Sequence, residues 1–477
     1  MQTVLAAYLF ILAIAVLAYM VAGYLRGRDD MLSLRNFFLL GFVIFQLTSA
    51  AVALKTGITM PYGVQDLTAT GSIYCVWVTS FLITFLVVYE MGLLSKPLAR
   101  ITPAIKMQPT EPFLWIASCC FLFLGLALRF VPIPLVGVLA NMLGVALLAI
   151  AAGISAWIWA RRPLNPAAVT LLITISSCAV VFALIGEFGR RSLVAVGGCV
   201  LWGAYYSRMR YEAQQTVIVR LAVLAVPLVV FVALFTAARG SLRNENADLK
   251  QQLSTVAAAD AKTGILGLLD GQGAGVHSMW LIENFPDSYP YRPFLSSTIG
   301  YFLAYPIPRD GFWDEKPDSL SMDLPSLARL RNVNRDVLTI GPGIIGHAAA
   351  DGGFPFVILY AFLFALILRY FDQVTRNNAL QPLAVLPVGA ALGQVLGFPR
   401  GEAGVFLFIY LFSATASYIL MFVGAKMLER SGFFYPVGVN PFDPAQMAHT
   451  YDDYDQEHDD THEDVDAHEH DPDADAA

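Results

Sequence analysis

The residues whose types and spacing are best suited to chemistry lie in one short stretch, Tyr305–Pro317, which reads Tyr-Pro-Ile-Pro-Arg-Asp-Gly-Phe-Trp-Asp-Glu-Lys-Pro. Its three prolines exclude a regular helix, because each lacks a backbone N–H and clashes with the preceding turn. Aromatic rings stand close to Arg309 and Lys316, and this combination can hold an anion and stack on a ring. The stretch is therefore predicted to form a polar binding site.

Three further arginines, Arg190, Arg191 and Arg400, stand at the ends of apolar segments. Arginine suits the bidentate binding of phosphate, so these residues and Arg309 are predicted to form an anion-binding cluster. The alternative is that they pair with lipid headgroups or with nearby acids such as Glu187.

The elements that must position these residues are membrane helices. The chain is 57% hydrophobic and only 14% charged, which is typical of a polytopic membrane protein. A helix of about 20 apolar residues crosses a bilayer, and we predict about eleven such spans, with Leu295–Tyr305 as a re-entrant twelfth piece in an alternative reading. The predicted spans lie near Val4–Tyr24, Asn36–Leu54, Ile73–Leu94, Pro112–Leu128, Pro134–Ala160, Ala167–Ile185, Leu193–Tyr206, Val217–Ala237, Phe354–Phe371, Gln381–Leu396 and Ala403–Met427.

Lysine and arginine in the short connections predict the orientation, since they are enriched on the cytoplasmic side. With the amino terminus outside, 15 of these residues face the cytoplasm and 5 face outward. The inner set is Arg26, Arg28, Arg35, Lys96, Arg100, Lys106, Arg161, Arg162, Arg208, Arg210, Arg220, Arg369, Arg376, Lys426 and Arg430, and the outer set is Lys55, Arg129, Arg190, Arg191 and Arg400.

This orientation divides the chain into four parts. Residues 1–237 form the first eight spans, 238–353 form one large extracytoplasmic loop, and 354–430 form the last three spans. Residues 431–477 form an acidic cytoplasmic tail. Tyr451–Asp475 holds many acidic residues and no basic one, so the tail is expected to be disordered.

The loop segment resembles a known signature. Ile307-Pro308-Arg309, followed by Trp313 and Lys316-Pro317 and preceded by Gly300-Tyr301, resembles the signature loop of the oligosaccharide repeat unit polymerase family, the Wzy-type O-antigen and exopolysaccharide polymerases. Other pieces of the chain are similar to parts of the same family, namely the glycine-rich Gly341–Gly353, the Arg400-Gly401-Glu402 triplet and Arg190-Arg191 after Gly189. The chain departs from the family at His347, where a carboxylate is often found nearby.

The resemblance implies an all-helical, GT-C-like glycosyltransferase in the bacterial cytoplasmic membrane, with its active site on the extracytoplasmic side. Such an enzyme transfers the growing chain from undecaprenyl diphosphate to the terminal sugar of a new lipid-linked repeat unit. The expected partners are this donor and acceptor, membrane lipid and a chain-length regulator, with no nucleic acid and no cofactor.

Residue roles follow from the needs of that reaction. The charge of the diphosphate leaving group requires fixed cations, and the candidates are Arg309, Arg400, Arg190, Arg191 and Lys316. The acceptor hydroxyl requires a general base, and the candidates are His347, Asp351 and Glu402. Sugar rings can stack on Trp313, Tyr301 and Tyr305. The outer loop shows no metal-ligand spacing, so metal-independent chemistry is expected.

Each candidate also has a structural alternative. His347 stands in a Gly/Ala-rich segment and can be a packed core residue, Asp351 can cap the helix that begins near Phe354, and Glu402 can pair with Arg400. Aromatic residues are common at membrane interfaces without any ligand. Two other functions remain as alternatives: an O-antigen ligase, which uses similar donors, and a lipid-linked oligosaccharide flippase or transporter.

The predicted orientation is tested with reporter fusions. A periplasm-active reporter joined after Ser254 should be active, and the same reporter after Asn378 should be silent, because the charge asymmetry puts these positions on opposite sides. Activity at both positions, or at neither, would contradict the predicted spans.

Overall fold

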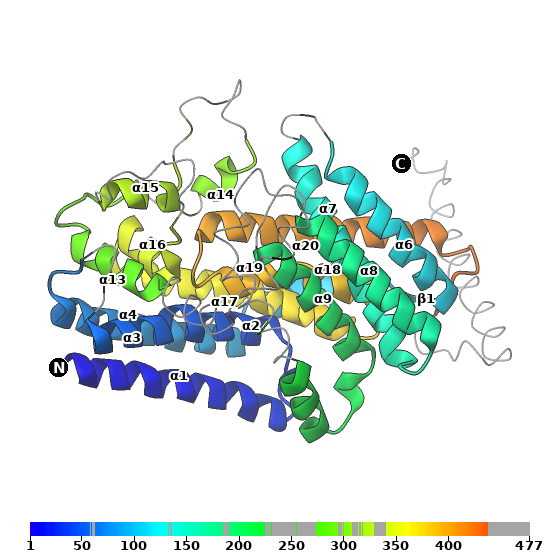
Figure 1. Cartoon of the computed structure of the whole chain (residues 1–477), viewed down its shortest axis with the longest axis horizontal. Helices are drawn as coiled ribbons and strands as arrows, with labels where there is room; N and C mark the ends of the chain where they lie inside the picture. The colour runs from blue at the N-terminus through cyan, green and yellow to red at the C-terminus, as the bar shows by residue number, and fades with distance from the viewer. Residues whose placement is uncertain are drawn as a thin grey trace, which may run out of the picture.

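The computed structural model describes residues 1–57, 59, 63–131, 133, 136–184, 190–224, 230, 254, 273–293, 298, 300–307, 313, 316, 318–328 and 340–436. The chain folds into a bundle of helices (Figure 1), which confirms the all-α membrane class. Among the described residues, eight helices are long and apolar enough to span a bilayer. These are α1 (Gln2–Leu25), the continuous helix Leu34–Thr56, α4 (Leu67–Met91), α6 (Glu111–Leu128), α7 (Val136–Arg161), α8 (Pro166–Leu184), α17 (Phe354–Asn377) and α20 (Ala403–Leu428).

Three of the predicted spans fall on shorter apolar helices. They are Ser192–Ser207 within α9 (Arg190–Ser207), the described helix Gln214–Leu224, and Pro382–Gly397, which consists of α18 (Pro382–Gly389) and α19 (Leu392–Gly397). Pro387 lies inside α18, and proline supplies no N–H to a helix. Eight of the predicted spans are therefore helices long and apolar enough to cross a bilayer, and the total of eleven remains a prediction.

The second span is not a uniform helix. It begins as α2 (Leu34–Phe42), widens into the π-helix η1 (Val43–Thr48) and ends as α3 (Ser49–Thr56). The Ser33 hydroxyl caps α2 by accepting from the N–H of Asn36, and the Asp66 carboxylate caps α4. A π-turn displaces the side chains that it carries, and such turns are frequent at functional sites.

The large predicted loop contains helices of its own: α13 (Ala274–Asn284), α14 (Tyr301–Ala304), α15 (Leu320–Leu327) and α16 (Gly343–Asp351). Figure 1 shows α13, α15 and α16 gathered at the end of the bundle where α1 begins. The backbone N–H groups of Gln65 and Asp66 donate to Glu283, which joins α13 to the start of α4. We call the end of the bundle that holds α13, α15 and α16 the loop end. The predicted re-entrant piece Leu295–Tyr305 lies partly outside the described residues, and its described part includes α14.

The opposite end gathers the basic connections, and we call it the arginine-rich end. There Arg210 pairs with Asp30 at 2.7 Å, and Arg162 pairs with Glu111 at 2.9 Å. The short helices α5 (Ser95–Ile101) and η2 (Met209–Tyr211) belong to this end. This grouping agrees with the prediction that 15 basic residues of the short connections lie on one side of the membrane. Such enrichment is typical of the cytoplasmic side.

One correction concerns the acidic tail, predicted to begin at residue 431. Phe434–Pro436 forms strand β2, which pairs antiparallel with β1 (Met107–Pro109) at the arginine-rich end. These residues belong to the folded part because backbone pairing and the buried Phe434 hold them there. Residues 437–477 lie outside the described part.

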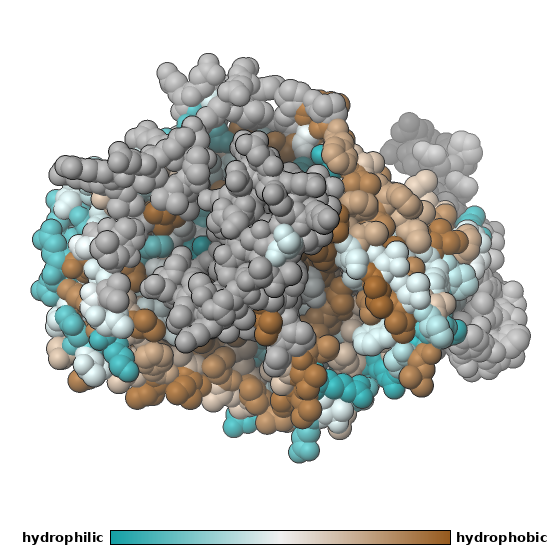
Figure 2. Space-filling view, viewed as in Figure 1, coloured by the Kyte–Doolittle hydropathy of each residue, from teal (hydrophilic) through white to brown (hydrophobic). Residues whose placement is uncertain are grey.

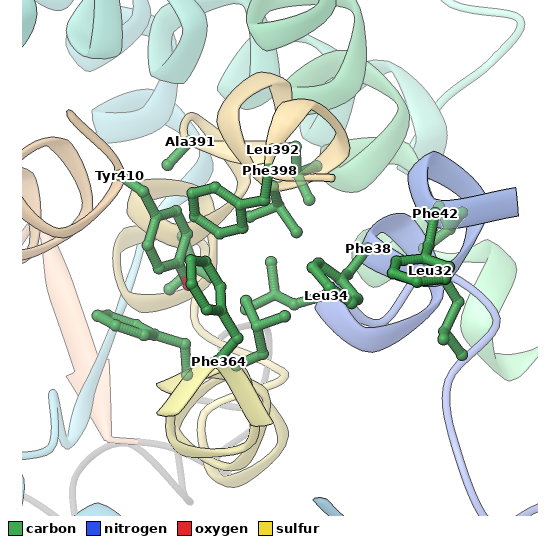
Figure 3. Packing of buried hydrophobic residues seen from close by; sticks show 14 of the residues in the cluster. Leu32, Leu34, Phe38, Phe42, Phe364, Ala391, Leu392, Phe398 and Tyr410 are labelled. Atoms are coloured by element: carbon green, nitrogen blue, oxygen red, sulfur yellow. The ribbon is translucent and has the colours of Figure 1, made fainter. Parts of the chain in front are cut away.

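The core between the two ends is aromatic. Phe38 of α2 lies 6.2 Å from Phe364 of α17, Phe364 lies 4.9 Å from Phe398, and Phe398 lies 5.7 Å from Tyr410 of α20, measured between ring centroids. Figure 3 shows these rings converging from their helices. Stacked and edge-to-face aromatic pairs of this kind stabilise a core beyond their buried area. Because Phe398 directly precedes Pro399 and Arg400, this core also holds the turn that leads into α20.

The outward face of the bundle is apolar, as a lipid-facing surface should be. Along α1, Val4, Ile11 and Ile14 are each 66% exposed. Figure 2 shows the corresponding brown band along the lower edge of the molecule, with polar side chains at its ends.

Close helix packing provides a stability prediction. A Cβ on Gly203 of α9 would overlap the carbonyl oxygen of Gly153 in α7, whereas a Cβ on Gly424 of α20 meets nothing within 4 Å. Small residues permit this close approach between membrane helices. We expect Gly203→Ala to destabilise the protein by roughly 1–3 kcal/mol through overpacking, and Gly424→Ala to have little effect. Thermal unfolding of both variants in detergent tests this, and equal melting temperatures would contradict the α7–α9 packing.

Candidate functional site at the loop end

The structure brings several predicted site residues to the loop end. His347 and Asp351 lie one turn apart on α16, and Glu402 precedes α20. Arg309 lies outside the described residues. Arg190 and Arg191 open α9, and their side chains lie outside the described part.

His347 and Glu402 form a buried pair. The His347 side chain is fully buried, its Nε2 lies 3.3 Å from Oε1 of Glu402, and the Ala403 N–H donates to the same nitrogen at 3.1 Å. An amide N–H can only donate, so Nε2 carries the lone pair in this arrangement. Glu402 Oε2 accepts from the N–H of Ser321 at 2.8 Å, which ties α15, α16 and α20 together. These contacts of His347 and Glu402 therefore position three helices relative to one another.

Asp351 is held by two hydroxyl groups. The Thr298 Oγ1 and the Tyr360 OH both donate to its Oδ2, and all three side chains are buried. The alternative that Asp351 caps α17 is wrong, because Gly353 occupies the N-cap position and the Asp351 side chain bonds elsewhere. Asp351 thus joins α16 to α17 and to the chain that precedes α14.

Lys316 anchors the start of the proline-rich segment. Its Nζ donates to the carbonyl oxygens of Tyr305 at 3.1 Å and Ile307 at 2.8 Å. The same ammonium lies over the rings of Tyr301 and Tyr305, 5.6 and 5.9 Å from their centroids. Trp313 is 40% exposed and Tyr301 is buried. Among the described aromatic candidates, Trp313 is therefore the ring best placed to meet a sugar from solution.

Arg400 lies on the turn between α19 and α20, 5.8 Å from the Phe45 ring centroid. Gly341 packs so closely on this turn that a Cβ there would overlap the Arg400 carbonyl oxygen. The N-terminus of α20 contacts α14, since a Cβ on Gly404 would meet the Thr298 carbonyl and the Phe302 nitrogen. The Arg400 turn thus stands beside the segment that leads into Tyr305–Pro317.

Gln46 is a residue of this site that the sequence reading missed. Placed in η1, it donates from Nε2 to the Pro399 carbonyl at 2.5 Å and accepts from the Tyr74 hydroxyl at 2.6 Å. Gly343, at φ +72°, approaches the same amide so closely that a Cβ would meet Gln46 Nε2. The contact fixes the carbonyl that immediately precedes Arg400. An amide inside an otherwise apolar span was the available signal.

His277 of α13 is a second missed residue. Its Nδ1 lies 2.8 Å from the Gly341 carbonyl oxygen. A carbonyl can only accept, so Nδ1 carries the proton and Nε2 is the basic nitrogen of the neutral ring. Burial lowers the pKa of His277 to about 4, the hydrogen bond to Gly341 opposes this shift, and the charge of Arg400 reinforces it. A neutral imidazole therefore lies beside a permanent cation.

This arrangement combines fixed positive charge with a basic nitrogen that stays neutral. Preorganised cations stabilise charge that develops on a leaving group, and a positioned base can accept a proton from an attacking hydroxyl. Within the described ranges, no group of three or more His, Cys, Asp or Glu is placed to hold a metal ion.

Comparison with family models, curated proteins and solved structures gives no match to this chain.

The neutral state of His277 predicts a pH dependence of stability. A histidine with pKa 6.5 when unfolded and about 4 when folded leaves stability intact above pH 6.5 and lowers it progressively as pH falls towards 4. Because the ring is half-buried, we expect a loss of roughly 1–3 kcal/mol over this window. The melting temperature of the purified protein should therefore fall more steeply between pH 7 and pH 4.5 than that of His277→Gln. Parallel curves for the two proteins would show that His277 does not titrate in this way.

Proposed function

We propose that this protein is a membrane glycosyltransferase that polymerises undecaprenyl-diphosphate-linked oligosaccharide repeat units on the outer face of the bacterial cytoplasmic membrane. The observation that carries the proposal is the Arg400 turn. Gln46 and Gly341 hold its backbone, and α14 lies beside it at the start of the proline-rich segment. Two of the segments that resemble the polymerase family, the Arg400 turn and the described start of the proline-rich segment, are thus neighbours at one end of an apolar bundle.

The donor diphosphate would bind the cations of this end. Arg400 presents a guanidinium from a turn with fixed backbone, and Arg309 belongs to the adjoining segment. Planar guanidinium groups match pairs of phosphate oxygens, and such donors stabilise the charge on the departing diphosphate without reorganising. Lys316 would contribute by holding the backbone of this segment in place, because its ammonium already binds the carbonyl groups of Tyr305 and Ile307. Arg190 and Arg191 remain further candidates for the same anion.

The acceptor hydroxyl would lose its proton to a base at the same end. His347 and Glu402 are buried and engaged with each other, and Asp351 accepts from two hydroxyl groups, so the geometry favours positioning roles for all three. His277 is half-buried and adjoins Gly341 and the Arg400 turn. Its position beside the Arg400 turn makes it a further candidate for this base, although its lowered pKa weakens it as a proton acceptor.

The bundle would hold the polyprenyl chain of each substrate. Exposed apolar side chains cover its outward surface, so a lipid-linked donor can approach within the bilayer while its diphosphate and sugars stay at the loop end. The new repeat unit would stack its terminal sugar on an exposed ring such as Trp313. In this arrangement the diphosphates of the donor and of the acceptor both stay at one membrane surface.

Arginine substitutions test the proposal. Arg309→Ala and Arg400→Ala should each lower polymerisation by about 10²–10³, and Arg309→Lys should restore it only in part, because an ammonium cannot replace a planar fork. The measurement is polymer length on a gel in a polymerase-null strain, with membrane abundance checked by blot.

Lys55→Ala serves as the matched control, since Lys55 is an exposed cation at the end of α3. It should leave polymer length unchanged. Long polymer from both arginine variants at normal abundance would remove these residues from the reaction and contradict the proposed site.

A further inference from the structure

A groove lies at the arginine-rich end, far along the bundle from the loop end. It has a volume of about 380 Å³ and is bordered by the end of α7, by η2 and by the helix Gln214–Leu224. Trp159, Met209, Val219 and Val223 contribute an apolar lining. This volume and lining are typical of sites for small amphiphilic ligands.

The polar edge of the groove carries two arginines. Arg208 and Arg220 both line it, and their side chains are 48% and 46% exposed. Both contact the same carboxylate, with Arg208 Nε 3.4 Å and Arg220 NH1 2.6 Å from Glu212 Oε1. Two guanidinium groups on one carboxylate leave one positive charge in excess. Arg208 NH1 also donates to the Ala160 carbonyl oxygen at 3.3 Å, and each guanidinium has five N–H donors, more than these contacts use.

The groove is placed where lipid headgroups would meet it. Trp159 lies in the last turn of α7, two residues before Arg161, and tryptophan and arginine at a helix end mark the membrane interface. Val219 and Val223 are 62% and 64% exposed, so this side of the helix is left uncovered within the described part, as a lipid-facing surface would be. An occupant must therefore combine apolar chains with a negative head.

We propose that this groove is a binding site for an anionic phospholipid, whose phosphate lies between Arg208 and Arg220 and whose acyl chain lies against Trp159 and Val223. Arginine binds phosphate through paired N–H donors, and basic sites between membrane helices on this side recognise anionic headgroups. A zwitterionic lipid has the same chains without net negative charge, so it should bind more weakly. This inference does not depend on the proposed function.

The test uses native mass spectrometry of the purified full-length protein in detergent, titrated with phosphatidylglycerol and separately with phosphatidylcholine of the same chains. We expect tighter binding of phosphatidylglycerol. Replacing Arg208 and Arg220 together with glutamine should weaken that binding roughly 25-fold, at about fivefold for each arginine near a membrane surface. Lys426→Gln is the matched control, because Lys426 is 48% exposed and paired with Glu429 at the same end.

Fluorescence gives an independent readout of the same site. Phosphatidylglycerol with brominated chains should quench the wild-type protein more than Trp159→Phe, since Trp159 lines the groove. The proposal is overturned if the two lipids bind equally, or if Lys426→Gln weakens binding as much as the double variant does. It is also overturned if brominated lipid quenches Trp159→Phe as strongly as the wild-type protein. A dimer that dissociates in the double variant, without bound lipid, would assign the groove to a second copy and would also overturn it.

Discussion

The hydrogen bond from Gln46 to the Pro399 carbonyl is the contact on which the loop end depends. It joins two turns that are 353 residues apart in the sequence, one in the second span and one just before the last. In a low-dielectric interior an unpaired carbonyl or amide costs several kcal/mol, so this pairing strongly favours one position for the turn. Tyr74, Ser278 and Gly343 meet the same amide, so α4, α13 and α16 are held to it as well.

A second polar network holds the arginine-rich end. Arg35 is fully buried, and its guanidinium contacts Asp29 at 2.9 Å and Glu90 at 3.0 Å. The Asp372 carboxylate of α17 accepts the N–H groups of Leu34 and Arg35, which lie at the start of α2. Charged groups inside a membrane protein are tolerated when they pair in this way. One polar network joins the helices at each end of the bundle, and the aromatic core of Phe38, Phe364 and Tyr410 lies between the two networks.

This division has a functional consequence. The loop end offers a neutral imidazole, a guanidinium and an exposed indole, whereas the arginine-rich end offers ion pairs and a groove of about 380 Å³ with an apolar lining. Under the proposed function, charge chemistry on a lipid-linked substrate would take place in the first environment. Under the further inference, an anionic lipid would bind in the second. The helices α7 and α9 pack closely through Gly153 and Gly203, which favours a rigid arrangement of these two helices over a hinged one.

The sequence alone determined the class of the protein and the position of most spans. Helices in a bilayer satisfy their own backbone groups, so each span is a local property that a run of apolar residues reveals. The grouping of basic residues at one end could also be predicted from the sequence, because these residues lie in the short connections between successive spans. Among the site residues, the sequence identified Arg400, His347, Asp351 and Glu402 as polar exceptions near the loop, and the structure places all four at the loop end.

Only the tertiary structure decided how these side chains are used. The partner of Glu402 proved to be His347 and the partners of Asp351 are Thr298 and Tyr360, whereas spacing had suggested an ion pair with Arg400 and a helix cap. Gln46 and His277 acquire their roles from Pro399 and Gly341, each brought close by helix packing. The physical reason is that a buried polar group takes whichever partner the packing of distant elements supplies, and this partner has no signature in the residues around it.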